Sequence, residues 1–389
     1  MTGFGARANL LRETSERGHH KVTFVELFFD LVFVFAVTQL SHHLLHDLSP
    51  LGLLQTLVLF VAVWWAWIDT AWVTNWLDPD RVPVRLMLLC LMLVGLVLSA
   101  TLPTAFHAGA LPFALAYTVF QTGRSAFTIW AVARHDPAQA LNFRRIVTWQ
   151  AAASFLWIIG AVLHDGGRLA AWGLAVVLES LAPATGFFVP GLGASKASEW
   201  KVEGAHMAER CALLVIIALG ESILVTGATA SGLAWSGTNI AAFAVAFLGT
   251  VAMWWIYFDT GSERASAHIA HAPESGQMAR LGYTYIHALI VMGIIGCAVS
   301  DELILAHPDG HASPAATLAI LGGPALYVLG CGLFKHPLLG RFPLSHYVGL
   351  AALALAVPFA GWLSPLALAA WATGALVLAA AWETIALRE

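Results

Sequence analysis

Residues 51–76 read LGLLQTLVLFVAVWWAWIDTAWVTNW, a run of 26 residues in which Asp69 is the only charged side chain. A helix needs about 20 residues to cross the hydrocarbon core of a bilayer, which is about 30 Å thick. This stretch is long enough to do so and apolar enough to be stable there. It therefore predicts a transmembrane helix.

The composition extends this prediction to the whole chain. Of 389 residues, 59% are hydrophobic and 11% are charged, whereas about a quarter of the residues in a soluble domain are charged. A soluble protein of this composition would lack a polar surface, so the expected partner of most of the chain is the lipid bilayer. The net charge of −4 is small and says little about partners, but the absence of a long basic run argues against nucleic acid as a ligand.

Eleven further runs meet the same length criterion, and their breaks carry Gly, Pro, Asp or basic residues. The sequence therefore predicts an all-α integral membrane protein of about twelve transmembrane helices. The predicted spans are 23–47, 51–76, 83–106, 110–134, 143–163, 169–189, 206–230, 237–260, 280–304, 314–334, 343–362 and 364–386.

The positions of Lys and Arg predict the orientation. When the loops are assigned alternately with the N-terminus inside, sixteen of the nineteen basic residues fall on the inside. Only Arg168 falls outside, and Arg124 and Arg210 lie within spans. Cytoplasmic loops of membrane proteins are enriched in Lys and Arg. We therefore expect both termini in the cytoplasm and the chain in the cytoplasmic (inner) membrane of a bacterium.

Two aromatic segments indicate an internal duplication. Residues 61–70 read VAVWWAWIDT and residues 251–260 read VAMWWIYFDT, with the two tryptophans and the Asp-Thr pair in register. This predicts a cytoplasmic segment 1–22, a six-helix repeat 23–190, a cytoplasmic linker 191–205 and a second repeat 206–387. Repeats of six helices are parallel, a recurring design of transporters. The alternative is a duplication that only enlarged a scaffold.

Several motifs resemble the bacterial low temperature requirement A family. They are ELFFDLVFVFAVTQLSH (26–42), WWAWIDTAWVTNWLDPD (64–80), FQTGRSAF (120–127), ERCALLVIIALGESIL (209–224) and WWIYFD (254–259). The resemblance covers essentially the whole chain, with Cys211 and Ala212 as a small departure from the family pattern. It implies a multi-pass membrane protein and carries over no substrate.

Ionisable side chains inside the predicted spans are the candidates for function, because each is costly in lipid unless it is paired or hydrated. Acids outnumber bases there, so some carboxylates must be protonated or bind a cation. The predicted substrate or ion pathway consists of Glu26, Asp30, Arg124, His206, Glu209, Arg210 and Glu221.

Glu26 and Asp30 are four residues apart and project from one helical face. Two neighbouring carboxylates of this kind suit a proton or cation relay. The alternative is that both pair with Arg124 or Arg210 as structural ion pairs, near the favourable N-terminal end of a helix dipole.

His206, Arg210 and Glu221 lie on one face of the seventh span. A histidine beside an arginine favours its neutral form and can exchange a proton. The alternative makes Arg210 a permanent partner of Glu209, Glu221 or Glu26. HMAE (206–209) has His/Glu spacing but no further ligand at helical distance, so no metal site is predicted.

The secondary candidates are Gln39, Asp69, Gln121, Asp259 and His287. Asp69 and Asp259 close the two aromatic segments and are either gates or hydrated caps beside interfacial tryptophans. The other three carry polar atoms that need interhelical hydrogen bonds. Since His42, His206 and His287 lie within spans, haem ligation stays open, although a lone His in a span more often packs and hydrogen-bonds. No cofactor is assigned.

The sequence contains no GxxxxGK[ST], HExxH or GxSxG motif and no lysine at the centre of a span, and no catalytic residue is predicted. The leading hypothesis is a secondary transporter, proton-coupled in its favoured form, that moves an unknown small solute, proton or cation. The alternatives are a membrane-embedded enzyme acting on a lipid or isoprenoid, and a channel or sensor of membrane state. The oligomeric state is left open.

Overall fold

The computed structural model describes residues 9–12, 21–196, 199–200, 202–259 and 275–386. In these residues the regular structure is helical, with two isolated β-bridges, Leu11 to Leu77 and Val189 to Gly193. The chain divides into two compact units. The first takes the described residues of Met1–His43, Leu51–Arg210 and Pro273–Gln277, and the second takes those of Leu44–Pro50, Cys211–Ala272 and Met278–Glu389.

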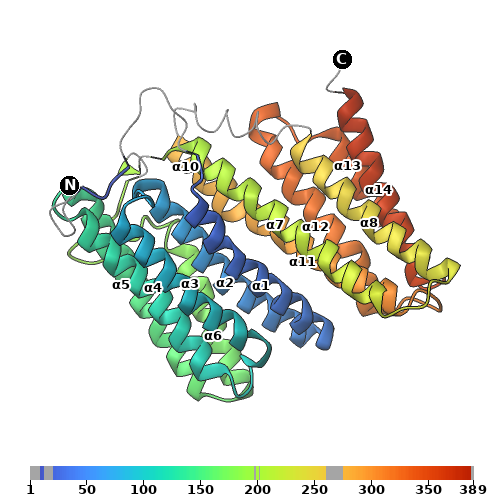
Figure 1. The fold of residues 1–389 in the computed structure, drawn as a ribbon, viewed down its shortest axis with the longest axis horizontal. Coiled ribbons are helices and arrows are strands. Elements are labelled where there is room, and N and C mark those ends of the chain that lie inside the picture. The colour runs from blue at the N-terminus through green and yellow to red at the C-terminus, as the bar shows by residue number, and fades with distance from the viewer. Residues whose placement is uncertain (1–8, 13–20, 197–198, 201, 260–274, 387–389) are drawn as a thin grey trace. The chain divides into compact units, whose positions relative to one another are not determined.

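The first unit is built mainly from six long helices (Figure 1) and the start of a seventh. They are α1 (Phe24–His46), α2 (Pro50–Trp76), α3 (Val82–Thr101), α4 (Ala110–Val132), α5 (Pro137–Val162), α6 (Asp165–Leu181) and the first turns of α7 (Gly204–Ser231). Short turns join the consecutive helices from α1 to α6, and a 3-10 turn, Leu102–Thr104, extends α3.

The second unit contains the remainder of α7 and the helices that follow it. These are α8 (Gly237–Phe258), α10 (Ser275–Ala279), a π-helical segment (Arg280–Ile286), α11 (His287–Ala306), α12 (Pro314–Leu339), α13 (Leu344–Ala356) with a 3-10 turn (Val357–Phe359), and α14 (Pro365–Ala386). α10, the π-helical segment and α11 follow one another without a break.

Nine helical segments among the described residues are long and apolar enough to cross a bilayer. They correspond to α1, α2, α3, α5, α7, α8, the continuous segment ending in α11, α12 and α14. The other three predicted spans are also helical, but α4 is more polar, and α6 and α13 are shorter. The prediction of a helical, multi-pass membrane protein is confirmed.

Two of the predicted spans whose boundaries differ in the structure show the physical reason. The span predicted at 143–163 begins at Pro137, because the Asp136 side chain accepts a hydrogen bond from the Gln139 N–H and caps the helix. The span predicted at 169–189 is helical over Asp165–Leu181 and ends before a turn in which Gly186 and Phe187 have positive φ.

Three cations that the orientation analysis counted as loop residues are buried within helices. Arg145 donates to the Leu192 carbonyl, Arg168 donates to the carbonyls at the end of α5, and Lys335 donates to the Ile256 carbonyl. The assignment of these residues to loops was wrong. Helix ends extend past the predicted boundaries, and long side chains turn there onto carbonyl groups that lack a helical partner.

The α11–α12 interface brings backbone against backbone. A Cβ atom added at Gly293 would lie 2.5 Å from the Tyr327 nitrogen, and one at Gly296 would lie 2.8 Å from the Gly323 Cα. Small residues that let helices approach this closely are typical of helix pairs in membranes. The glycines therefore determine the spacing of this pair.

Gly323→Ala is expected to destabilise the protein by about 1–3 kcal/mol, because its Cβ would lie 2.7 Å from the backbone of Gly296 and Cys297, which has no room to shift. Gly322→Ala is the matched control. Its Cβ would meet only the flexible Leu318 side chain at 3.5 Å, so the higher helix propensity of alanine should stabilise by up to about 1 kcal/mol. Unfolding in detergent measures both, and equal effects would contradict this account of the interface.

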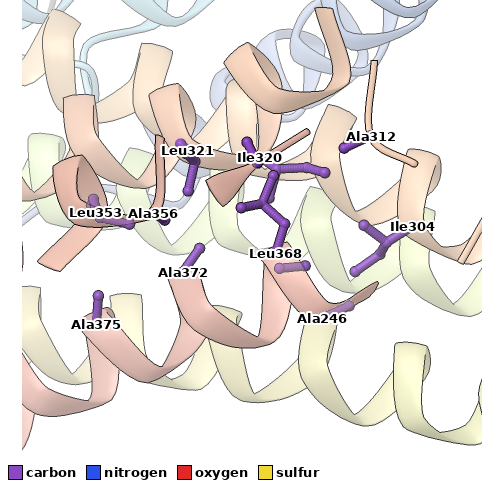
Figure 2. Packing of buried hydrophobic residues seen from close by; sticks show 12 residues of the cluster. Ala246, Ile304, Ala312, Ile320, Leu321, Leu353, Ala356, Leu368, Ala372 and Ala375 are labelled. Atoms are coloured by element: carbon purple, nitrogen blue, oxygen red, sulfur yellow. The ribbon is translucent and has the colours of Figure 1, made fainter. Parts of the chain in front are cut away.

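Alanine-rich packing surrounds the end of this helix pair. Ile304, Ile320 and Leu321 from α11 and α12 gather against Leu368 and Ala372 of α14, as Figure 2 shows. Ala246, Ala312, Leu353, Ala356, Ala360, Ala369 and Ala375 complete the cluster. Its small side chains keep α8, α13 and α14 close to the α11–α12 pair.

Candidate functional site

The two acids of α1 meet two bases of α7 in the first unit. Glu26 Oε1 lies 2.9 Å from His206 Nε2, and Arg210 Nη2 donates to Asp30 Oδ1 at 2.7 Å. All four side chains are completely buried. Acids at positions i and i+4 of one helix therefore face bases at i and i+4 of another, and one helical period aligns both contacts.

Glu26 receives further donors from outside its helix. The Thr23 N–H and hydroxyl both donate to Oε2 at 2.9 Å, and Arg12 Nη2 lies 3.3 Å from the same oxygen. The Arg12 guanidinium is held by the Thr74 carbonyl, to which Nε donates at 2.7 Å. Arg12 precedes the first helix, and no pattern in the sequence connects it with Glu26.

Asn75 and Arg12 both contact the His206 ring. The Asn75 amide pairs with the backbone of Glu203, accepting from its N–H at Oδ1 and donating to its carbonyl from Nδ2. That orientation directs Nδ2 at His206 Nδ1, 3.2 Å away. Because an amide NH₂ only donates, it faces the lone pair of Nδ1, while Nε2 lies 2.9 Å from Glu26 Oε1 and 3.1 Å from Arg12 Nη2.

Trp67 contacts both partners of the Asp30–Arg210 ion pair. The Trp67 indole N–H donates to Asp30 Oδ1 at 2.9 Å, and the Arg210 guanidinium lies over the Trp67 ring, 5.7 Å from its centroid. Asp30 Oδ2 and Arg210 Nε and Nη1 have no hydrogen-bond partner within the described chain. Charge is nonetheless balanced, because Arg12 compensates Glu26 and Arg210 compensates Asp30. This arrangement favours the structural interpretation of the α1 acids.

The remaining primary candidates lie elsewhere. Arg124 belongs to a different cluster of the first unit, described below, and does not join Glu26 or Asp30. Glu209 accepts from the Val22 N–H at 3.0 Å. Glu221 is buried on the part of α7 that belongs to the second unit.

Arg124 pairs with Asp69, at 2.9 Å, and also donates to the Ala66 carbonyl and the Thr70 hydroxyl. Gln150 lies beside the same carboxylate, at 3.3 Å. Asp69 sits within α2, two turns from its end, and it is engaged by a cation from α4. A neighbouring helix therefore supplies a charge partner for Asp69, in addition to any hydration of its partly exposed side chain.

Glu179, on α6, is buried next to this ion pair. Both of its carboxylate oxygens accept from the Tyr117 hydroxyl at 3.0 Å, and Gln121 Nε2 donates to that hydroxyl at 3.1 Å. No ion pair of the described residues includes Glu179, because Arg124 is already paired with Asp69. Glu179 is the functional candidate that the sequence selection omitted. Tyr117 and Gln121 share a face of α4, but nothing in the sequence pairs α4 with α6.

A small cavity connects these groups. Its polar walls are Asp69, Gln121, Gln150 and Glu179, and Trp65 and Trp149 are among its aromatic walls. Gln121 Oε1, which is buried, has no partner in the described chain. The centre of a water molecule can occupy about 20 Å³ of the cavity. A single water needs about 10–15 Å³ by this measure, so the cavity holds one or two waters or a small ion.

The secondary candidates have local roles. Asp259 ends α8 in an exposed position and accepts from the Thr384 hydroxyl at 3.3 Å. Gln39 is partly buried on α1. His287 uses both ring nitrogens, with the Tyr257 hydroxyl and the Gly282 carbonyl each 2.8 Å away. Since both nitrogens of His206 are also engaged and His42 is exposed, these histidines do not fit haem ligation.

The second unit contains a buried pair of its own. Lys335 Nζ lies 2.8 Å from Glu383 Oε1 and donates to the Ile256 carbonyl at 2.7 Å. Both side chains are almost completely buried. Cations thus pair with four acids inside the helices: Glu26, Asp30, Asp69 and Glu383. The acids in excess of the bases are therefore other carboxylates.

Comparisons with known proteins agree with the motifs. The model of the family described as bacterial low temperature requirement A protein matches residues 21–381. An uncharacterized protein of Rhizobium meliloti (strain 1021) is 41% identical over 371 residues, which cover 95% of this chain and 90% of that protein. No solved structure matches.

Proposed function

The chain belongs to the bacterial low temperature requirement A family, and we propose that it is a secondary transporter that moves protons through the Glu179 cavity. Asp69, Tyr117 and Gln121 are the groups that exchange and orient the proton. A small solute or ion of unknown identity moves with the proton.

The observation that carries the proposal is the Glu179 carboxylate. It is 8% exposed, it lines a cavity that accommodates water, and its hydrogen bonds come from the Tyr117 hydroxyl. A buried acid without a compensating cation changes its protonation state more readily than one in an ion pair. Ionisable residues of this kind inside a membrane mark proton relays.

The size of the cavity supports a proton over an organic solute. Sites for small molecules typically enclose about 300–1,000 Å³, far more than the one or two waters that fit here. Water and the Tyr117 hydroxyl, in contrast, are sufficient to pass a proton between Glu179 and the edge of the cavity.

We further propose twelve membrane crossings arranged as two parallel six-helix repeats, with both termini in the cytoplasm of a bacterial cell and the chain in its inner membrane. A helix in each of the twelve predicted spans supports the count. The excess of Lys and Arg in the inside loops supports the orientation.

The alternative of a lipid-acting enzyme receives less support. Two grooves on the outside of the units, between α3 and α4 and between α8 and α14, could contact lipid chains. Their linings contain no acid or histidine that could act as a general base.

Proton flux tests the proposal. In sealed proteoliposomes that contain a pH-sensitive dye, Glu179→Gln is expected to reduce flux under an imposed gradient by at least about 100-fold, as loss of a proton-transferring group does. Asp259→Asn, which removes an exposed acid, is the control and should retain the wild-type rate. Tyr117→Phe should give an intermediate rate. Unchanged flux in folded Glu179→Gln, or wild-type traces equal to those of empty liposomes, would refute the proposal.

A further inference from the structure

The second unit contains a cavity with a single carboxylate. α8, α11, α12 and α14 enclose it, and Asp301 of α11 is the only acidic side chain in its lining. Asp301 is 8% exposed, and Ser222 donates to its Oδ2 over a long 3.3 Å. No ion pair of the described residues includes it. A buried carboxyl of this kind holds either a proton or a compensating cation.

Hydroxyl groups line the same cavity. Ser300, Thr250 and Thr373 are the residues that contribute them. The Thr250 and Thr373 hydroxyls donate to the carbonyls of Ala246 and Val245, both at 3.3 Å. A hydroxyl that donates its proton keeps lone pairs on oxygen. Both threonines therefore retain capacity to accept from, or coordinate, an occupant of the cavity.

Pro324 frees a backbone carbonyl at this place. It lies inside α12 and lines the cavity together with Ile320, four residues earlier. Because proline has no N–H, the Ile320 carbonyl receives no helical hydrogen bond from position 324. Helix carbonyls released in this way coordinate ions in transporters.

The space suits a single ion. The centre of a water-sized particle can occupy about 20 Å³, which is enough for one or two waters. Ile304, Ile320 and Ala372, seen among the packed side chains in Figure 2, belong both to the lining and to the apolar cluster beside it. Asp301 therefore faces a small chamber with few polar atoms beyond the oxygens named above.

We propose that this cavity binds a monovalent alkali cation, Na⁺ or Li⁺, through the Asp301 carboxylate, the hydroxyls of Ser300, Thr250 and Thr373, and the Ile320 carbonyl. One carboxylate with neutral oxygens balances a single positive charge. Ca²⁺ takes six to eight oxygens, commonly with several carboxylates, and Mg²⁺ keeps several waters, which this chamber cannot hold. No histidine lines it, so a transition metal is not favoured.

The site goes beyond the proposed proton function and lies in the other unit. Cation binding can be measured without transport, so the cation site and the proton transport function can be refuted independently. Absence of cation binding with intact Glu179-dependent proton flux overturns this inference alone. Cation binding without proton flux overturns the proposed function alone.

The test uses the purified full-length protein in lipid nanodiscs at constant ionic strength. Replacing choline chloride with NaCl or LiCl is expected to raise the unfolding midpoint in a saturable manner, because a ligand that binds the folded state stabilises it. Asp301→Asn should abolish this rise, and Thr373→Val should raise the apparent dissociation constant about tenfold or more. Asp259→Asn, an exposed acid at the end of α8, should respond as the wild type does.

Three results would overturn the inference. The first is an equal midpoint for the wild type in NaCl, LiCl and choline chloride. The second is a sodium response that persists in Asp301→Asn, which would place the ion elsewhere. The third covers the case in which Asp301→Asn does not fold: Thr373→Val and Ser300→Ala then decide, and wild-type sodium affinity in both would exclude the cavity as the site.

Discussion

Asp30→Ala is expected to lower the free energy of unfolding by about 3–5 kcal/mol, the usual cost of removing one partner of a buried ion pair. Arg210 would keep its charge in a position with no exposure to solvent, and two of its three nitrogens already lack a partner in the described chain. Trp67 would also lose its acceptor. Unfolding of the purified protein in detergent, followed by tryptophan fluorescence, measures the loss.

The double variant Asp30→Leu/Arg210→Met separates the cost of a buried charge without its partner from the contribution of the pair itself. It removes both charges and keeps side chains of similar volume. Apolar replacement of a buried pair is often neutral or stabilising, so the double variant should recover most of the stability lost by Asp30→Ala. A double variant as unstable as the sum of the two single variants would show that the pair itself contributes the stability.

In the second unit, Lys335→Met is expected to lower the free energy of unfolding by a similar amount, about 3–5 kcal/mol. Glu383 would remain buried without its cation, and the Ile256 carbonyl would lose a donor. Chemical unfolding with a fluorescence readout checks this loss.

Lys335→Met/Glu383→Leu is the matched control and should restore most of the lost stability. Asp30 and Lys335 belong to different units and share no partner, so the losses of the two single variants should add within about 0.5 kcal/mol. A strongly non-additive combination would mean that the two pairs are energetically coupled.

The sequence predicted the helices because lipid imposes a simple requirement on length and polarity. The segment 51–76 is helical almost as predicted, at Pro50–Trp76. Predicted helix boundaries were less accurate where a capping side chain sets the helix end, as at Asp136. A cap depends on individual side chains, whereas the prediction used the average polarity of a window.

The candidate site was predictable only where one helix contained the information. The spacing of Glu26 and Asp30 indicated a shared face, and pairing of the α1 acids with Arg210 was one of the alternatives considered. Arg12 and Glu179 could not be identified as site residues in this way. Their roles depend on which segments are neighbours, and a single sequence with no alignment carries no signal of that kind.

Cations compensate the α1 acids to which the acid excess in the sequence directed attention. Counting charges along the chain directed attention to Glu26 and Asp30, which are compensated. Lys335 and Arg12 were counted as loop cations, and the structure uses them to neutralise acids inside helices. Removing those acids from the count leaves Glu179 and Asp301 as carboxylates for which no ion pair is found in the described chain.

The backbone contacts of α11 with α12 have a mechanical consequence. At Gly293, Gly296 and Gly323 the two main chains lie too close to admit a Cβ atom, so we expect α11 and α12 to move together as one rigid pair. The α11–α12 pair forms one wall of the Asp301 cavity, and α8 and α14 form the other. Any opening of the Asp301 cavity is therefore expected to come from movement of α8 or α14.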